Sequence, residues 1–168
     1  MSETKGTTVC LTGHNPQTLT ILGDENSLET TQLRKVLKKS IIELIETENA
    51  KHFISGMSLG IDMMCAEIVL ELKEEYPFIT LECALPYETQ AIRWRVESQE
   101  KYYFILRDCD KDTMLQTRYT SDCISKCNKY MVDKSDIILA VWNGSNSGTG
   151  NIINYARKIN KTIKQIAC

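Results

Sequence analysis

The chain is poor in the residues that build metal centres and disulfide frameworks. Its 168 residues include only two histidines, His14 and His52, and its seven cysteines form no Cys-x-x-Cys pair. Without closely spaced cysteine and histidine ligands, a zinc site is not expected. An odd number of scattered cysteines also argues against a disulfide framework. We therefore expect reduced thiols, and we predict no metal site and no cofactor.

Long apolar runs and a strong net charge are absent as well. No stretch approaches the roughly 18 apolar residues that a bilayer requires, and the first six residues lack the apolar segment of a signal peptide. The formal net charge of -2 argues against a general electrostatic grip on nucleic acid or on an anionic membrane. We therefore expect a cytoplasmic protein with no membrane partner, and we do not expect a nucleic-acid partner.

What the sequence does contain is a regular alternation of strand and helix patterns. Apolar, β-branched-rich segments predict strands at 7–12, 52–55, 78–85, 114–117, 137–142 and 162–166. Apolar residues at helical spacing predict helices at 28–48, 61–74, about 88–106, 122–132 and 151–158. The segments 16–27 and 108–112 are expected to be irregular. This pattern predicts a single domain over residues 1–168, with an α/β, Rossmann-like, doubly wound fold: a mainly parallel sheet with helices on both faces.

Three of the expected strands end in glycine-bearing loops that lead into helices. These loops are Thr12-Gly13-His14, Ser55-Gly56-Met57-Ser58 with Gly60 and Asp62, and Gly144 with Ser147-Gly148-Thr149-Gly150-Asn151. Glycine lets the backbone approach a ligand closely, and a helix start offers unpaired N–H groups to an anion. Since the carboxyl ends of parallel strands meet at one edge, we expect the loops to converge on one phosphate-bearing ligand.

Several loop residues have a structural alternative to a binding role. Asp62, in the first turn of its helix, is predicted to accept hydrogen bonds from a ribose or a base, but an acid there also compensates the helix dipole. Thr149 and Asn151 can contact a ligand or cap the last helix. His14 can bond a phosphate, carry a proton or simply occupy a turn.

A proline and an aromatic residue follow the third expected strand. Pro86, Tyr87 and Gln90 predict an aromatic ring set against a base. Tyr87 and Trp94 can equally be core or interface residues. Neither alternative is decided by the sequence.

The next expected helix carries both aromatic and cationic side chains. Trp94, Tyr102 and Tyr103 give it apolar surface that association would hide, so we expect a homo-oligomer. Arg93 and Arg95 are the cations nearest to a bound phosphate, although a solvated helix face explains them equally well.

Taken in order, the motifs of the chain resemble those of a known superfamily. They are Thr12-Gly13-His14-x-Pro16, Ser55-Gly56-Met57-x-Leu59-Gly60-x-Asp62, Ala66-Glu67, Pro86-Tyr87-Glu88 with Gln90, Asn128-x-Tyr130, and Ala140-Val141-Trp142-x-Gly144 with Ser147-Gly148-Thr149. Over nearly the whole chain this order resembles the YpsA-like branch of the SLOG superfamily. Those Rossmann-like proteins are related to the LOG phosphoribohydrolases and to the DNA-processing protein DprA.

The resemblance implies a pocket for a nucleotide-derived, ADP-ribose-like ligand at the carboxyl ends of the sheet. Two departures change what it implies. Asn15 stands where such proteins often carry a basic residue. Asn151 and Asn154 stand where a phosphoribohydrolase resembling Pro-Gly-Gly-x-Gly-Thr has a glutamate. The carboxylates left for glycosidic hydrolysis are Asp62 and Glu67.

These observations predict a small cytoplasmic binding module for a nucleotide or nucleotide-derived signal, ADP-ribose-like or cyclic, which it senses or sequesters. The alternative is a nucleoside-monophosphate N-glycosidase, or phosphoribohydrolase, that uses Asp62 and Glu67 as catalytic residues. A DprA-like nucleic-acid partner is not expected, because the chain lacks a basic stripe interleaved with aromatic residues.

Overall fold

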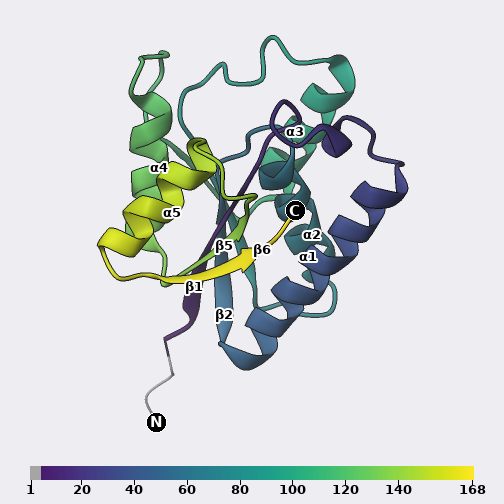
Figure 1. The fold of residues 1–168 in the computed structure, drawn as a ribbon, viewed down its shortest axis with the longest axis vertical. Helices are drawn as coiled ribbons and strands as arrows, with labels where there is room; N and C mark the ends of the chain where they lie inside the picture. The colour runs from purple at the N-terminus through teal and green to yellow at the C-terminus, as the bar shows by residue number, and fades with distance from the viewer. Residues whose placement is uncertain (1–4) are drawn as a thin grey trace.

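The computed structural model describes residues 5–168 and contains one six-stranded sheet between two helical layers (Figure 1). The strands are β1 (Thr7–Gly13), β2 (Ala50–Ser55), β3 (Thr80–Leu85), β4 (Lys111–Met114), β5 (Ile137–Val141) and β6 (Thr162–Ile166). The helices are α1 (Leu28–Thr47), α2 (Ile61–Leu72), α3 (Val96–Asp108), α4 (Cys123–Lys134) and α5 (Gly148–Lys158), with a short 3-10 turn η1 (Thr20–Gly23). All five strand pairs are parallel, which confirms the predicted Rossmann-like α/β fold.

The strand order places the glycine loops beside one another. Across the sheet the order is β4-β3-β2-β1-β5-β6, so the chain builds outward from β1 and then returns to its other side. Leu11 of β1 lies beside Ser55 of β2, and Gly13 lies beside Val141 of β5. The point where the order reverses, between β1 and β5, is where open α/β sheets bind their ligands.

Alternating side chains divide the core between the two faces of the sheet. Leu11, Phe53 and Leu81 belong to the larger cluster on the side of α1, α2 and α3, whereas Cys10 and Ile54 belong to the smaller cluster under α4 and α5 (Figure 1). The alternation follows from the two-residue period of a strand. Within residues 5–168, no helix has the length and hydropathy to cross a membrane.

Serine residues define the start of two helices. The Ser27 hydroxyl accepts the N–H of Thr30 at 3.1 Å, and the Ser147 hydroxyl accepts the N–H of Gly150 at 3.1 Å. Of the two roles considered for Thr149 and Asn151, capping of the last helix is therefore wrong, because Ser147 is the cap. The cap at Ser147 satisfies a helix-terminal N–H group and brings two glycines into the first turn of α5.

The segment between β3 and α3 differs most from the prediction. The helix expected from about residue 88 begins at Val96 instead. The Glu88 N–H donates to the Thr117 oxygen at 3.1 Å, and Gln90 Nε2 donates to the Gly56 oxygen at 3.4 Å. These long-range contacts hold residues 86–95 in turns against their local helical preference.

Two further expectations for this region are wrong. The short strand predicted at 114–117 lies at Lys111–Met114, because it pairs with β3 from Glu82 to Leu85, so residues 111 and 112 are not irregular. Tyr102 is only 1% exposed and packs edge-on against Trp94, which precedes the helix. Of the three aromatic residues expected on an exposed helix, Tyr103 is the exposed one, at 57%.

One buried carboxylate ties β3 to its neighbours. Burial alone would raise the pKa of Glu82, but hydrogen bonds from His52 at 2.8 Å, Tyr130 at 2.6 Å and Thr113 at 2.9 Å lower that pKa to about 2. The partners lie on β2, α4 and β4. A buried charge is tolerated in a sheet when it is paired in this way.

Close packing explains the glycine at the end of β1. A Cβ atom on Gly13 would lie 2.4 Å from Cγ2 of Ile61, the first residue of α2. Ile61 is fully buried, and its N–H donates to the His14 oxygen at 3.3 Å. The glycine is thus required for α2 to rest on β1.

We expect Gly13→Ala to lower the free energy of unfolding by about 1–3 kcal/mol, because the branched Ile61 side chain has little freedom to move away. The measurement is urea denaturation followed by circular dichroism. Gly23→Ala is the matched control, since a Cβ there meets nothing within 4 Å. Equal stability of the two variants would contradict this account.

Candidate functional site

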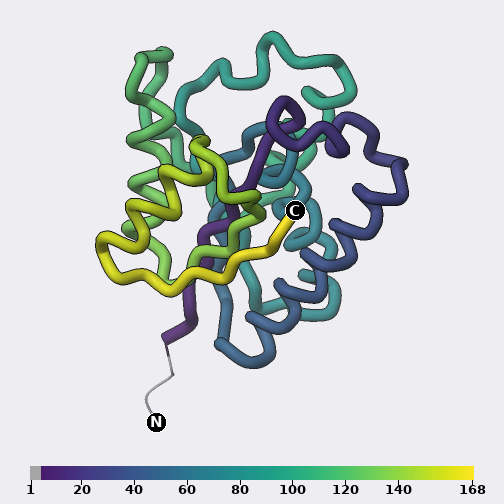
Figure 2. The backbone as a smooth tube through the Cα atoms, viewed as in Figure 1, coloured from purple at the N-terminus to yellow at the C-terminus, as the bar shows by residue number. Residues whose placement is uncertain are grey.

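The loops that follow β1, β2 and β5 form the candidate site. The segments after β1 and β3 run over the same upper edge of the molecule in Figure 2, which is the carboxyl edge of the sheet. His14 Nε2 lies 3.0 Å from Asn143 Oδ1 and accepts the Asn143 N–H at 3.1 Å, so the first loop is bonded to the third. The structure thus brings the glycine loops together at one edge.

The imidazole ring of His14 makes the contact between the first and third loops. The side chain is 2% exposed, and the Nε2 atom faces the backbone and amide of Asn143. Asn143 Oδ1 accepts the Ser145 N–H at 3.0 Å, which fixes the amide orientation. The ring nitrogen that meets the third loop is therefore occupied by the protein itself.

The glycines of the site divide into packed and open positions. A Cβ on Gly60 would lie 2.7 Å from the His14 oxygen, and one on Gly150 would lie 2.8 Å from the Ser145 oxygen. On Gly144 and Gly148, by contrast, a Cβ would meet nothing within 4 Å. The open glycines both belong to the third loop, so that loop has the free space that a ligand needs.

The hydroxyl residues at the ends of β1 and β2 are buried. Thr12 is 3% exposed and Ser55 is 0% exposed. Ser55 Oγ donates to the Asp62 backbone oxygen at 2.8 Å and accepts the Met57 N–H at 3.2 Å. The hydroxyl of Ser55 therefore shapes the second loop, while Ser58 is the hydroxyl residue of that loop with partial exposure.

The carboxylate of Asp62 lies beneath the turn formed by Gly56 and Ser58. Its Oδ2 atom accepts the Ser58 hydroxyl at 2.7 Å, whereas its Oδ1 atom is buried and has no hydrogen-bond partner. Burial raises the pKa of Asp62 to about 7, and the Ser58 hydrogen bond, together with the Ser58 and Gly13 backbone beside the carboxylate, opposes the rise. An unpartnered buried carboxylate oxygen costs free energy unless a ligand or water completes it.

The turn above Asp62 is strained. Met57 has φ 61, in the left-handed region that residues with a Cβ rarely adopt, and its side chain is fully buried. Such a conformation costs of order 1–3 kcal/mol and persists when the surroundings impose it. Burial of the Met57 side chain holds the turn, and strained turns of this kind are concentrated at ligand-binding sites.

The third loop offers hydrogen-bond donors at the start of α5. The Ser147 hydroxyl accepts a hydrogen bond from the Gly150 N–H, and the Ser147 backbone oxygen accepts one from the Asn151 N–H at 2.9 Å. The N–H groups of Gly148 and Thr149 in the first turn remain for an incoming acceptor. Ser145 Oγ nearby is buried without a partner. The exposed side chain of Asn151 lies one turn further along α5.

An aromatic pair stands beside these loops. The rings of Tyr87 and Tyr119 meet edge-on with centroids 5.3 Å apart, and Tyr119 is 62% exposed. Pro86 is buried at the end of β3, and Gln90 reaches the Gly56 oxygen. Tyr87 therefore lies near the second loop, and its neighbour Tyr119 comes from the connection before α4.

The structure places Glu67 away from these loops. Glu67 lines a cavity of about 580 Å³ between α1, α2 and α3, together with Arg34 and Lys101. Because Asp62 and Glu67 are five residues apart on α2, they point to different sides of the helix. The two carboxylates proposed for hydrolysis do not share one site.

Two residues of this edge were not identified from the sequence. Asn143 was missed because its role depends on His14, which is 129 positions away in the chain. Tyr119 was missed because the loop before α4 shows no pattern that links it to Tyr87. The Trp-Asn-Gly step after β5 was the available signal for Asn143.

The buried position of Asp62 predicts a pH-dependent stability. Its folded pKa of about 7 lies above the ordinary value of 3.8, so the folded state holds the proton that the unfolded chain has lost between these values. The group therefore lowers stability progressively as the pH rises from about 4 to above 7. Asp62→Asn lacks this group, so its free energy of unfolding should rise relative to that of the unmodified chain as the pH increases. Over this range we expect the difference between the two to grow by at most about 4 kcal/mol.

Urea unfolding at pH 4, 6 and 8 measures this difference. Both proteins carry the same Glu82 network, so its own pH dependence cancels. A difference that is constant with pH would contradict the burial of an ionisable Asp62.

Solved structures with the same fold include two DNA-processing proteins. DprA from Streptococcus pneumoniae superposes with a TM-score of 0.62 at 12% identity over 95% of this chain and 50% of that chain. DprA from Helicobacter pylori superposes with a TM-score of 0.61 at 15% identity over 95% of this chain and 64% of that chain. This chain thus spans only about half to two thirds of each DprA chain.

The second of these structures concerns the single-stranded DNA binding mode of the Helicobacter pylori protein. The expectation that nucleic acid is not a partner is therefore corrected. It rested on net charge and on the missing basic stripe, and neither excludes a fold whose structural neighbour binds single-stranded DNA. At this level of identity the likeness itself shows the fold.

Sequence comparison gives the family. A UPF0398 protein of Brevibacillus brevis is 32% identical over 141 residues, which are 83% of this chain and 74% of that protein. The SPbeta prophage-derived protein YoqJ of Bacillus subtilis is 32% identical over 139 residues, which are 76% of this chain and 81% of that protein. The family model YpsA, described as the YspA SLOG family, matches residues 9–167. The chain therefore belongs to the YpsA family of SLOG proteins, as its motifs predict.

Proposed function

We propose that the carboxyl edge of the sheet binds a nucleotide or a nucleotide-derived ligand, with its phosphate at the third loop and its ribose at Asp62. The observation that carries the proposal is the Oδ1 atom of Asp62, which is buried and lacks a partner beneath a strained turn. A ribose hydroxyl is a donor that would satisfy this oxygen once the strained turn above it moves to admit the sugar.

The third loop is the better phosphate site of the two helix starts. At the second loop, the Asp62 carboxylate itself lies beneath the turn and accepts the Ser58 hydroxyl at 2.7 Å, so the position for an anion is filled by the protein. At the third loop, Gly148 and Gly144 leave open space in front of the N–H groups that begin α5. Helix-terminal N–H groups favour a negative charge at such a position.

Capture of the ligand is favoured over its hydrolysis. Glycoside cleavage commonly uses two carboxylates that flank the bond. Glu67 lies in the cavity between the helices, which leaves Asp62 as the carboxylate beside the loops. We therefore propose a binding module that senses or sequesters its ligand, and we treat base release as an outcome to be tested.

A charged side chain at Gly148 tests the phosphate position. Gly148→Glu places a carboxylate in open space and suits the start of a helix, so the fold is retained while a phosphate is repelled. By isothermal titration calorimetry with ADP-ribose, AMP and cyclic AMP, we expect at least about a tenfold loss of affinity. Gly148→Gln, of equal size and without charge, is the control and should lose less.

The same titrations decide between the outcomes. Lack of heat with every ligand, or equal losses in Gly148→Glu and Gly148→Gln, would contradict the proposed phosphate position. Chromatography of the mixtures reports free base. Base released by the unmodified chain but not by Asp62→Asn would replace capture by hydrolysis.

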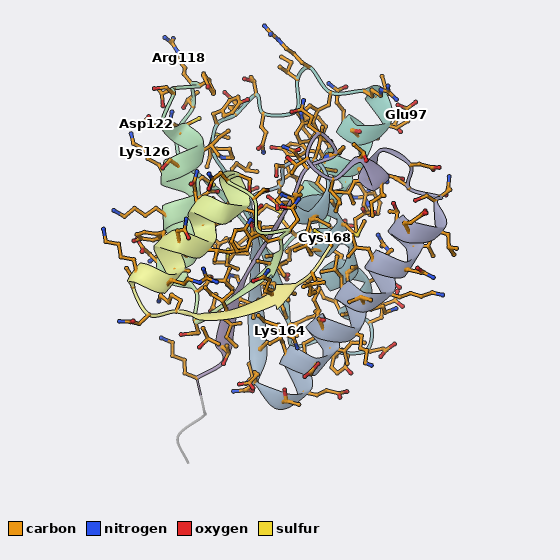
Figure 3. The ribbon with its side chains drawn as sticks, viewed as in Figure 1. Glu97, Arg118, Asp122, Lys126, Lys164 and Cys168 are labelled. Carbon is orange, nitrogen blue, oxygen red and sulfur yellow. The ribbon has the colours of Figure 1, made fainter. Side chains whose placement is uncertain are left out.

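Single-stranded DNA is a second candidate ligand for the same edge. The exposed Tyr119, paired with Tyr87, offers an aromatic face to a base. Figure 3 shows the side chain of Arg118, the preceding residue in the chain, pointing outward. In the described part of the chain, Arg118 has no carboxylate within 4.0 Å. An aromatic side chain next to a free cation is the arrangement that binds single strands.

We expect Tyr119→Ala to weaken binding of a fluorescent oligothymidylate by about tenfold, because one stacked base contributes about 1–3 kcal/mol. Fluorescence anisotropy at low salt measures the affinity. Phe78→Ala removes another half-exposed aromatic ring, from the connection before β3, and serves as the control. Equal effects of the two substitutions would exclude a stacking role for Tyr119.

A further inference from the structure

The outer face of α3 is an apolar stripe that the rest of the chain leaves uncovered. Val96, Tyr103 and Phe104 are 62%, 57% and 54% exposed. The opposite side of the helix buries Tyr102 and Ile105. Burial of one side fixes the orientation of the helix, so the stripe faces outward.

The spacing of this stripe is that of a helix–helix seam. Val96, Glu100, Tyr103 and Arg107 follow one another at intervals of four, three and four residues, which places them along one line of the helix surface. Figure 3 shows Glu97, at the start of α3, directed away from the sheet. The seam combines apolar side chains with charges of both signs.

The surface around the seam has a ridge between two hollows. One hollow of about 580 Å³ lies toward α1 and α2, and the other, of about 490 Å³, lies along the outer side of α3. Both hollows are lined by Glu100 and Phe104, which therefore form the ridge that separates them. Helices pack by placing the ridge of one into the groove of the other.

The charges on α3 are complementary to those of a second α3 helix that runs in the opposite direction. Glu97 and Glu100 lie in its N-terminal half, and Arg107, whose guanidinium bonds the Asp108 carboxylate at 2.9 Å, lies in its last turn. Among the described residues, no cationic nitrogen lies within 4.0 Å of either glutamate carboxylate. A two-fold axis crossing the middle of α3 would bring Arg107 of each copy to the glutamates of the other.

We propose that a second copy of this chain covers the stripe, in a symmetric dimer in which two α3 helices cross in antiparallel orientation. The Phe104 ridge of each copy enters the larger hollow of the other. That hollow supplies contact area from α1 and α2, which is needed because a helix of about 20 Å alone falls short of the roughly 800 Å² per partner that a stable interface buries. Arg107 pairs with Glu100 across the axis.

The stripe is independent of the nucleotide proposal. It lies on α3 within the helical layer, whereas the ligand proposal uses the loops at the carboxyl edge. The dimer and the ligand site are therefore tested separately.

Sedimentation equilibrium over a range of protein concentrations tests the dimer. The unmodified chain is expected to approach twice the mass of one chain, and Phe104→Glu is expected to weaken association at least about tenfold. Phe78→Glu, which adds the same charge at another half-exposed phenylalanine, is the control and should associate normally. Urea midpoints of both variants confirm that each is folded.

A charge exchange identifies the pairing. Glu100→Arg or Arg107→Glu alone places like charges together and should weaken the dimer about tenfold, whereas the double variant should restore it. A monomer at every concentration overturns the proposal. So does a dimer that resists Phe104→Glu, or a double variant that is no better than its parents.

Discussion

The close approach of three chain segments around the end of β1 is the constraint on which the site depends. Gly13 lies against Ile61, and Gly60 lies against the His14 oxygen, because neither glycine carries a Cβ. The His14 ring then reaches Asn143 in the loop after β5. These contacts set the distance between the loops, so each loop occupies a position that its own sequence does not define.

This packing gives the two helix starts different properties. At α2, the loop closes over Asp62 and excludes water, which raises the pKa of the carboxyl to about 7 and leaves one oxygen without a partner. At α5, Gly144 and Gly148 face open space. One half of the edge is thus buried and polar, and the other half is open and rich in donors. The proposed ligand, which joins a phosphate to sugar hydroxyls, would contact both halves.

The fold itself says little about which ligand that is. DprA shares this backbone at 12–15% identity, and two relatives in sequence are 32% identical to this chain over the aligned residues. A common fold can serve different chemistry, because function depends on the side chains placed at the site. Here Asp62, the third loop and Tyr119 are the groups that distinguish the candidates. The α3 stripe adds a surface whose role depends on its own charges and shape.

The sequence by itself determined the alternation of strands and helices, the Rossmann-like class and the family, because the apolar periods of 2 and 3.6 residues and the order of short motifs are local properties. It also identified the glycine loops, although it could not separate Gly13, which packs, from Gly148, which is open. The start of α3, the burial of Tyr102, the bond between His14 and Asn143 and the separation of Glu67 from Asp62 were decided by the tertiary structure. They depend on contacts between residues far apart in the chain, and no local pattern records those contacts.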